Sequence, residues 1–297
     1  MTPHVVGLQG HTGRIGSAVL KAIIEHHNAG KVVLVILHRP GSDLSSVPNG
    51  VETREIDLSR PDESKIKAAV KGLNVLVSLV SFFSFGDQVH LFKSLSETPG
   101  FVTYFTPLIG NPLWTVDKIK DSRVEAYVNG FREVTSRVKD VGVGLTSIQT
   151  GVFTDYFFDL KYLGTDFDAN SVVIPTGAET QRLALVTPEC LGHAISEIVS
   201  RLPESIRDKT FYAFDYCPTG DEIIQVFSKI HGAKPTVTAY TEKDYIEDVE
   251  SMSMKSSAAI YRNSWGSGDW GWAGQRLGEE NKNFQQLAEK YWASRQK

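Results

Sequence analysis

Residues 7–16 read GLQGHTGRIG, and they stand between a short apolar run and an amphipathic segment. Gly10, Gly13 and Gly16 give the GxxGxxG spacing of a dinucleotide-binding loop. In such a loop the first glycine permits a sharp turn, the second lets a pyrophosphate approach the backbone, and the third lets the helix pack closely. The helix start then offers free N–H groups and the positive end of its dipole to an anion. A glycine-rich turn in an unrelated α/β protein is the alternative interpretation.

The first 110 residues alternate apolar, β-branched runs with amphipathic segments. We predict strands over residues 4–9, 31–37, 51–57, 74–80 and 101–105, and helices over residues 15–27, 61–71 and 88–95. Nearly uninterrupted apolar strands are typical of a sheet that is covered on both faces. Strands that alternate with helices predict right-handed crossovers and a parallel sheet. The expected fold class is therefore α/β, a Rossmann-type doubly wound parallel sheet.

The second half of the chain is less regular. We predict helices over residues 131–140, 187–201 and 219–231, strands over residues 145–149 and 210–214, and a packed irregular loop over the Gly- and Trp-rich residues 261–274. From this order we expect residues 1–153 to form the dinucleotide-binding domain, with residues 183–232 returning to it. Residues 154–182 and 233–297 are expected to form a smaller α/β lobe that binds the substrate.

The end of the second predicted strand indicates which dinucleotide is bound. An NAD-selective site usually has Asp or Glu at this point to hold the ribose hydroxyls. This chain has Arg39 instead, followed by Pro40, Gly41 and Ser42. A guanidinium there can make charge-assisted contacts with a 2′-phosphate and stack on adenine. Arg14 is a second candidate for the same phosphate. The sequence therefore predicts NADP(H), and a surface arginine in a turn is the alternative.

These residues, with those that follow, resemble the NmrA-like and isoflavone-reductase-like branch of the atypical short-chain dehydrogenase/reductases, over residues 3–231. Residues 10–16 resemble the family's G-A-T-G-x-I-G loop, and residues 104–110 stand where it has F-I-P-S-E-F-G. Residues 150–153 resemble its P-G-x-F turn at the nicotinamide, and residues 185–192 its V-T-x-x-D-I-G helix start. The loop and strand-end chemistry together with the resemblance imply cofactor contacts from Gly10, Thr12, Gly13, Arg14, Ile15, Arg39, Asp57, Leu58, Ser81, Phe82, Gln88, Thr106, Gly151 and Phe153.

The chain departs from the family at the catalytic lysine. Reductases of the plant branch carry that lysine at the start of the helix before the P-G-x-F turn, and the matching position here is Phe131. The Tyr-x-x-x-Lys pair of ordinary short-chain dehydrogenases is also missing, since Phe131 stands four residues after Tyr127. A proton donor near the nicotinamide must come from elsewhere. The catalytic candidates are Asp155, Tyr156 and Lys120, and a structural role for each is the alternative.

We predict an NADPH-dependent reductase that acts on a C=O, C=N or activated C=C bond of a bulky small molecule in secondary metabolism. An aromatic set would line the pocket for a flat substrate: Phe82, Phe83, Phe85, Phe153, Phe157 and Phe158, covered by Trp265, Trp270 and Trp272. Ordinary core packing is the alternative, and the tryptophans also leave a homodimer open. One rival function is a non-enzymatic NADP(H)-sensing regulator that binds a protein partner. Another is an NADP(H)-bound cyclase or isomerase without redox chemistry.

Composition and charge exclude several other classes of protein. The net charge is −4 with no basic block, so nucleic acid is not an expected partner. Every apolar stretch is far short of the ~20 residues that span a bilayer. Cys190 and Cys217 fit free thiols in a reducing compartment, and we expect a cytoplasmic protein. No metal-ligand spacing and no GxSxG motif occurs, so neither a metal site nor a covalent hydrolase is predicted.

Overall fold

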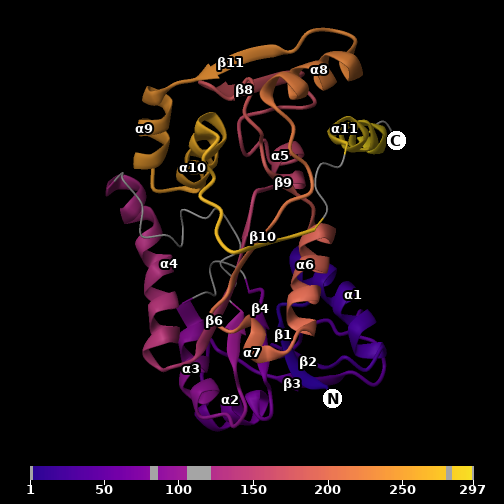
Figure 1. Cartoon of the computed structure of the whole chain (residues 1–297), viewed down its shortest axis with the longest axis vertical. Helices are drawn as coiled ribbons and strands as arrows, with labels where there is room; N and C mark the ends of the chain where they lie inside the picture. The colour runs from indigo at the N-terminus through magenta and orange to yellow at the C-terminus, as the bar shows by residue number, and fades with distance from the viewer. Residues whose placement is uncertain (1–2, 81–85, 106–121, 279–282, 296–297) are drawn as a thin grey trace.

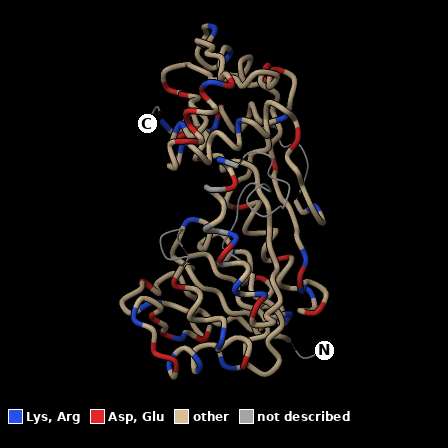
Figure 2. Tube along the Cα trace, turned by 90° about the vertical axis from the view of Figure 1, so that its left-hand side faces the viewer, with Lys and Arg blue, Asp and Glu red and all other residues tan. Residues whose placement is uncertain are grey.

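The structure is a computed structural model that describes residues 3–80, 86–105, 122–278 and 283–295. The molecule is elongated, with a layered α/β part at one end and a smaller group of helices with a short sheet at the other (Figure 1). The amino terminus lies in the α/β part and the carboxyl terminus in the smaller part. Basic and acidic residues are interspersed along the chain in both parts (Figure 2).

The central sheet has eight strands, and every neighbouring pair is parallel. In spatial order the strands are β12 (Gln275–Leu277), β10 (Thr210–Ala213), β6 (Gly144–Thr150), β5 (Thr103–Phe105), β4 (Val75–Ser78), β1 (His4–Gln9), β2 (Val32–His38) and β3 (Glu52–Glu55). This order confirms the predicted α/β class and the parallel sheet.

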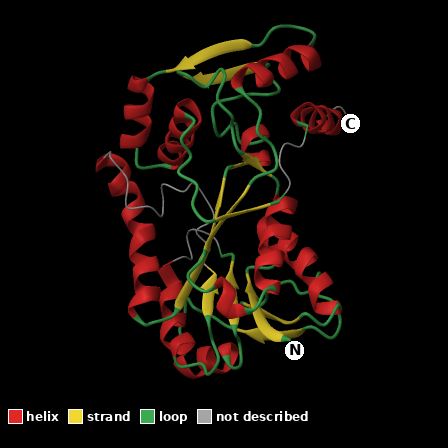
Figure 3. Cartoon of the chain, viewed as in Figure 1, coloured by secondary structure: helices red, strands yellow, loops and turns green. Residues whose placement is uncertain are grey.

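Helices cover both faces of this sheet (Figure 3). One face carries α1 (Arg14–Asn28) and α6 (Pro188–Ser200), and the other carries α2 (Glu63–Val70), α3 (Val89–Ser96) and α4 (Ser122–Asp140). Side chains of β2 alternate between the two cores: Leu34 and Ile36 join the first, and Val35 and Leu37 join the second. Since successive strand residues point to opposite faces, an apolar run is what a doubly covered strand requires.

The smaller part is built on a parallel pair, β8 (Ser171–Pro175) and β11 (Thr236–Tyr240). Around it lie α5 (Thr154–Phe158), α8 (Gly220–His231), α9 (Glu242–Glu250), α10 (Met254–Ser267) and α11 (Phe284–Arg295). A short pair, β7 (Val152–Phe153) and β9 (Leu185–Val186), joins it to the sheet, and α7 (Pro203–Ile206) precedes β10. Helix α8 lies with the smaller part, although its residues belong to segment 183–232, which was expected to return to the dinucleotide-binding domain. The proposed domain limits stay predictions.

Two predicted elements need correction. The irregular loop expected over residues 261–274 is wrong in its first half, because α10 continues to Ser267. The Ser253 side chain caps this helix by accepting a hydrogen bond from the Lys255 N–H, and Gly268 ends it with φ 70°. Helix α4 begins at Ser122, nine residues before the expected start at 131. Its early turns bury Val124 and Val128, which are four residues apart as on one face of a helix. Gly130, a poor helix former, follows them and weakens this helical pattern in the sequence.

Trp265 anchors α10 in the core. Its side chain is 0% exposed, and its indole Nε1–H donates to the Gln181 carbonyl at 3.0 Å. We expect Trp265→Ala to lower the free energy of unfolding by about 3–5 kcal/mol, because it leaves a cavity where a large aromatic group was packed. Urea unfolding followed by circular dichroism measures this change. Trp265→Phe keeps an aromatic ring in place and should lower the free energy of unfolding by clearly less. A loss below about 1 kcal/mol for the alanine variant would contradict the role of Trp265 as a core anchor.

Candidate functional site

The glycine loop between β1 and α1 has the geometry of an anion cradle. Gly10 has φ 87°, a value that favours glycine, and the Gly13 N–H donates to its carbonyl at 3.1 Å. A Cβ on Gly16 would lie only 1.9 Å from the Gly10 carbonyl oxygen, so α1 approaches the loop as closely as a backbone allows. Gly13 occupies the N-cap position and brings no capping side chain, which leaves the first N–H groups of α1 for an anion.

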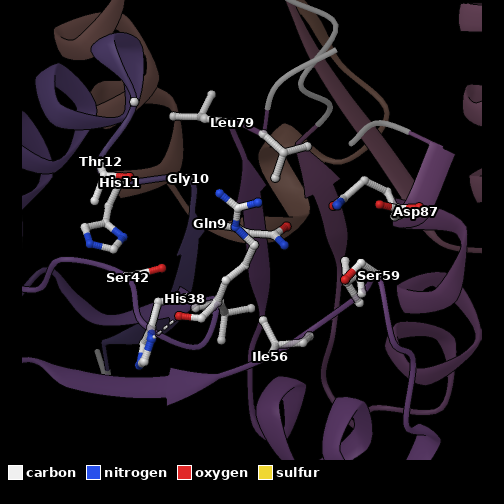
Figure 4. Close-up of a pocket in the computed structure, with 16 residues that line it drawn as sticks. Gln9, Gly10, His11, Thr12, His38, Ser42, Ile56, Ser59, Leu79 and Asp87 are labelled. Atoms are coloured by element: carbon white, nitrogen blue, oxygen red, sulfur yellow. Dashed lines mark hydrogen bonds between the residues drawn. The ribbon is translucent and has the colours of Figure 1, made fainter. Parts of the chain in front are cut away.

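A cavity of about 250 Å³ opens beside this loop, at the carboxyl ends of β1, β2 and β4 (Figure 4). The strand order reverses between β1 and β4, and ligands of doubly wound folds bind at such a switch point. Apolar side chains from β2 and the segments after β3 and β4 line part of the cavity: Leu37, Ile56, Leu58, Leu79 and Val80. Polar groups line the rest: Gln9, His11, Thr12, His38, Arg39, Ser42, Ser59, Asp87 and Gln88.

Buried hydrogen bonds fix the back wall of the cavity. The Ser78 hydroxyl lies 2.9 Å from Gln88 Oε1 and 3.2 Å from Gln9 Oε1, and the Tyr104 hydroxyl donates to Gln88 Oε1 at 3.4 Å. Burial raises the pKa of Tyr104 well above its usual range, so this phenol stays neutral. Tyr104 therefore serves to position Gln88 at the wall.

The structure brings together part of the predicted cofactor set. Gly10, Thr12, Gly13, Arg39, Leu58 and Gln88 line the cavity. Asp57 is not among the lining residues. Its carboxylate accepts hydrogen bonds from the hydroxyl and N–H of Ser59, and these lower its pKa. Ile15 packs against the core that α1 shares with the sheet. Four predicted residues lie outside the described residues: Ser81, Phe82, Thr106 and Lys120.

Arg14 turns away from this cavity toward α5. Its guanidinium forms an ion pair with the Asp155 carboxylate and lies over two rings, with Cζ 5.0 Å from the centroid of Phe153 and 4.7 Å from that of Tyr156. Burial lowers the pKa of Arg14, and the neighbouring Tyr156 and Asp159 oppose that shift. This contact brings both described catalytic candidates beside the glycine loop, although they follow it by about 140 residues of chain.

Gly151 fixes the turn that leads to these candidates. A Cβ there would lie 2.1 Å from the Ala184 carbonyl oxygen, and the Val152 N–H donates to the same oxygen at 2.9 Å. The turn therefore packs backbone against backbone, and it starts the β7–β9 pair. Phe153 is half-buried beside Arg14 at the end of this pair.

Four of the six described aromatic side chains expected to line a substrate pocket belong to the core instead. Phe157 and Phe158 are 0% and 2% exposed. Trp265 and Trp270 are also buried, and the Trp270 indole donates to the Arg182 carbonyl at 3.2 Å. Only Trp272 of the tryptophan set is half-exposed, stacked on Trp270 with the ring planes 1° apart. Core packing, the alternative interpretation, holds for the four buried residues. Phe82, Phe83 and Phe85 are not among the described residues.

Sequence reasoning missed several groups at the cavity: His11, His38, Ser42, Ser59 and Asp87. His38 ends β2, and the other four come two to nine residues after the ends of β1, β2, β3 and β4. That placement is the signal that was available, since these strand ends meet at one edge of a parallel sheet. Within the described ranges, no group of three metal-ligating side chains gathers and no helix is long and apolar enough to cross a bilayer.

No family model and no curated protein sequence matches the chain. Several solved structures do match it. Isoflavone reductase is 19% identical, with 98% of this chain and 100% of that one covered and a TM-score of 0.76. The chain has the isoflavone-reductase-like fold. Leucoanthocyanidin reductase from Vitis vinifera, solved with NADPH, is 16% identical over 97% and 99% of the chains with TM-score 0.75. AtPrR2 with NADP+ and (+)pinoresinol is 18% identical over 97% and 99% with TM-score 0.76. The isoflavone-reductase-like fold thus includes nearly the whole chain, beyond the residues 3–231 over which the sequence resembles that family.

Proposed function

We propose that the protein is an NADPH-dependent reductase of a bulky small molecule. The observation that carries this proposal is the glycine cradle with Arg39 and Ser42 on one cavity. A dinucleotide would place its pyrophosphate at the N–H groups after Gly13, at the start of α1, and its 2′-phosphate at the Arg39 guanidinium and Ser42 hydroxyl. Adenine would lie against Ile56 and Leu58. Structural neighbours solved with NADPH and with NADP+ support the same coenzyme.

Bound NADPH supplies a hydride, and the chain must supply a proton to the reduced group. Tyr156 is the proposed donor. Its neighbour Asp155 is ion-paired with Arg14, and an ionised carboxylate only accepts hydrogen bonds. The Tyr156 phenol has an O–H group that can donate, and its ring lies against the Arg14 guanidinium at the glycine loop. Lys120 remains a third candidate donor.

The substrate class is part of the same proposal. A C=O, C=N or activated C=C bond accepts a hydride. We place the reaction in secondary metabolism because structural neighbours are named for pinoresinol, leucoanthocyanidin and isoflavone. A protonated imine would reduce the need for the lysine that Phe131 replaces. The homodimer and the cytoplasmic location stay predictions.

Two measurements test this function. Titration calorimetry with NADPH and NADH should give tighter binding of NADPH, and no heat with either nucleotide would overturn the proposal. Oxidation of NADPH should then be followed spectroscopically against a panel of enones, imines and ketones. Turnover of at least one member is expected, with a matched reaction without protein as the control.

Phe131 at the family's lysine position favours two other functions. One is an NADP(H)-sensing regulator, which predicts nucleotide binding without turnover and a partner protein whose capture changes with NADPH. The other is a cyclase or isomerase, which predicts product formation while the NADPH concentration stays constant. Analysis of the reaction products, together with the absorbance of NADPH over time, separates the regulator and the cyclase or isomerase from a reductase.

Arg39→Ala should weaken NADPH binding by about 10- to 100-fold, because a charge-assisted contact contributes roughly 1.5–3 kcal/mol. NADH affinity should stay within about twofold, since NADH lacks the 2′-phosphate. Calorimetry measures both constants. Arg60→Ala is the matched control, as Arg60 is exposed and stands outside the cavity lining. Equal losses for both nucleotides would contradict the role of Arg39.

A further inference from the structure

His11 is a departure from the family loop that the proposed function leaves unexplained. The resembling loop has a small residue after its first glycine, whereas this chain has an imidazole. The His11 side chain is buried, with 2% of the residue exposed, and it lines the same cavity as Arg39 and Ser42. A histidine ring held inside an otherwise glycine-rich loop needs a partner, because a buried polar group without one is costly.

That partner is the loop that follows β2. His11 Nε2 lies 3.0 Å from the Asp43 carbonyl oxygen, across 32 residues of sequence. A carbonyl oxygen only accepts, so the ring must donate and Nε2 must carry the proton. The hydrogen bond joins the glycine loop to the loop that carries Arg39, and Figure 4 shows His11 and Ser42 on the same side of the cavity.

The segment between Arg39 and Asp43 is a tight turn. Pro40 and Gly41 occupy its centre, Gly41 has φ 74°, and the Ser42 N–H donates to the Arg39 carbonyl at 3.1 Å. Proline followed by glycine with positive φ is typical of a type II turn. The turn reverses the chain, so that Arg39 and Ser42 at its two ends both face the cavity. Asp43 comes next, where its carbonyl meets the ring.

We propose that His11 is a positioning residue that sets the preference for NADPH over NADH. The inference rests on the proposed cofactor site. The imidazole holds the Arg39–Ser42 turn against the glycine loop before the nucleotide arrives, so the turn is already ordered when the 2′-phosphate binds. NADH makes no use of the turn, because its ribose carries no phosphate there. His11 therefore acts on the ratio of the two affinities and not on dinucleotide binding in general.

Calorimetry with NADPH and NADH tests this on two variants of the full chain. His11→Ala removes the donor and should weaken NADPH binding by about tenfold, with NADH affinity unchanged. His11→Gln places an amide N–H at similar reach and should restore most of the NADPH affinity. An unchanged NADPH/NADH ratio in the alanine variant, or an equal loss for both nucleotides, overturns the proposal.

A second pair of variants reaches the turn from its exposed side. Gly41 and Gly30 are both exposed, both have positive φ, 74° and 67°, and a Cβ on either would meet no described atom within 4 Å. Gly41→Ala and Gly30→Ala thus impose the same kind of backbone strain, but only Gly41 lies in the turn. We expect a selective loss of NADPH affinity in Gly41→Ala alone. Equal affinities in the two variants would overturn the inference. Wild-type protein that binds neither nucleotide would refute the proposed function itself.

Discussion

Gly16→Ala should abolish detectable dinucleotide binding, with a loss of about 100-fold or more in affinity for NADPH. The added methyl would lie 1.9 Å from the carbonyl oxygen of Gly10 and 2.7 Å from its carbonyl carbon. Both are backbone atoms of the turn that shapes the cradle, so relief requires α1 to move away from the loop. That movement takes the N–H groups after Gly13 out of reach of a pyrophosphate. Titration calorimetry measures the affinity.

Circular dichroism of the same protein separates a displaced helix from an unfolded one. Gly86→Ala is the control, because Gly86 is exposed and lies directly before the cavity residues Asp87 and Gln88. Its methyl would meet no atom of the described residues within 4 Å. It should bind as the wild type does. Gly13→Ala is an intermediate case, since among the described residues its methyl would meet only the Gly10 carbonyl oxygen, at 3.3 Å. Normal NADPH binding by Gly16→Ala would show that the loop holds no pyrophosphate.

The amino-terminal half was predictable because its information is local. Gly10 with φ 87° and the contact of Gly16 with the loop follow from spacing alone. The apolar run of β2 indicated a doubly covered strand, and its side chains do alternate between two cores. Arg39 at the end of β2 was expected at the cavity and lines it.

The contacts that complete the candidate site could not be predicted, because tertiary packing makes them. His11 meets Asp43 through a backbone carbonyl, and a carbonyl carries no sequence signature. Arg14 was expected at a phosphate, yet its guanidinium pairs with Asp155 from an element far along the chain. Helix α10 was hidden for a different reason. Its carboxyl end, with Trp265 and Gly266, runs into a Gly- and Trp-rich stretch, so local propensity argued against a helix that burial of Trp265 stabilises.

Tyr156→Phe should lower kcat by about 100- to 10,000-fold on whichever enone, imine or ketone the wild type reduces. The substitution removes only the phenol oxygen. Its ring can still pack beside Phe153 and Tyr162, whose centroids lie 5.7 and 5.6 Å away, so the fold and NADPH affinity should be preserved. Steady-state kinetics with calorimetry as the binding control measure both quantities.

Asp155→Asn distinguishes the two neighbouring candidates. The amide cannot form the ion pair with Arg14, but it leaves the Tyr156 hydroxyl in place. If the phenol is the donor, the loss of kcat should be smaller than in Tyr156→Phe, because the arginine loses a partner while the proton source remains. The reverse order, with Tyr156→Phe near wild type and Asp155→Asn inactive, would make the carboxyl group the donor. In that case Arg14 would have to release it before each turnover, because a carboxyl group must hold a proton before it can give one.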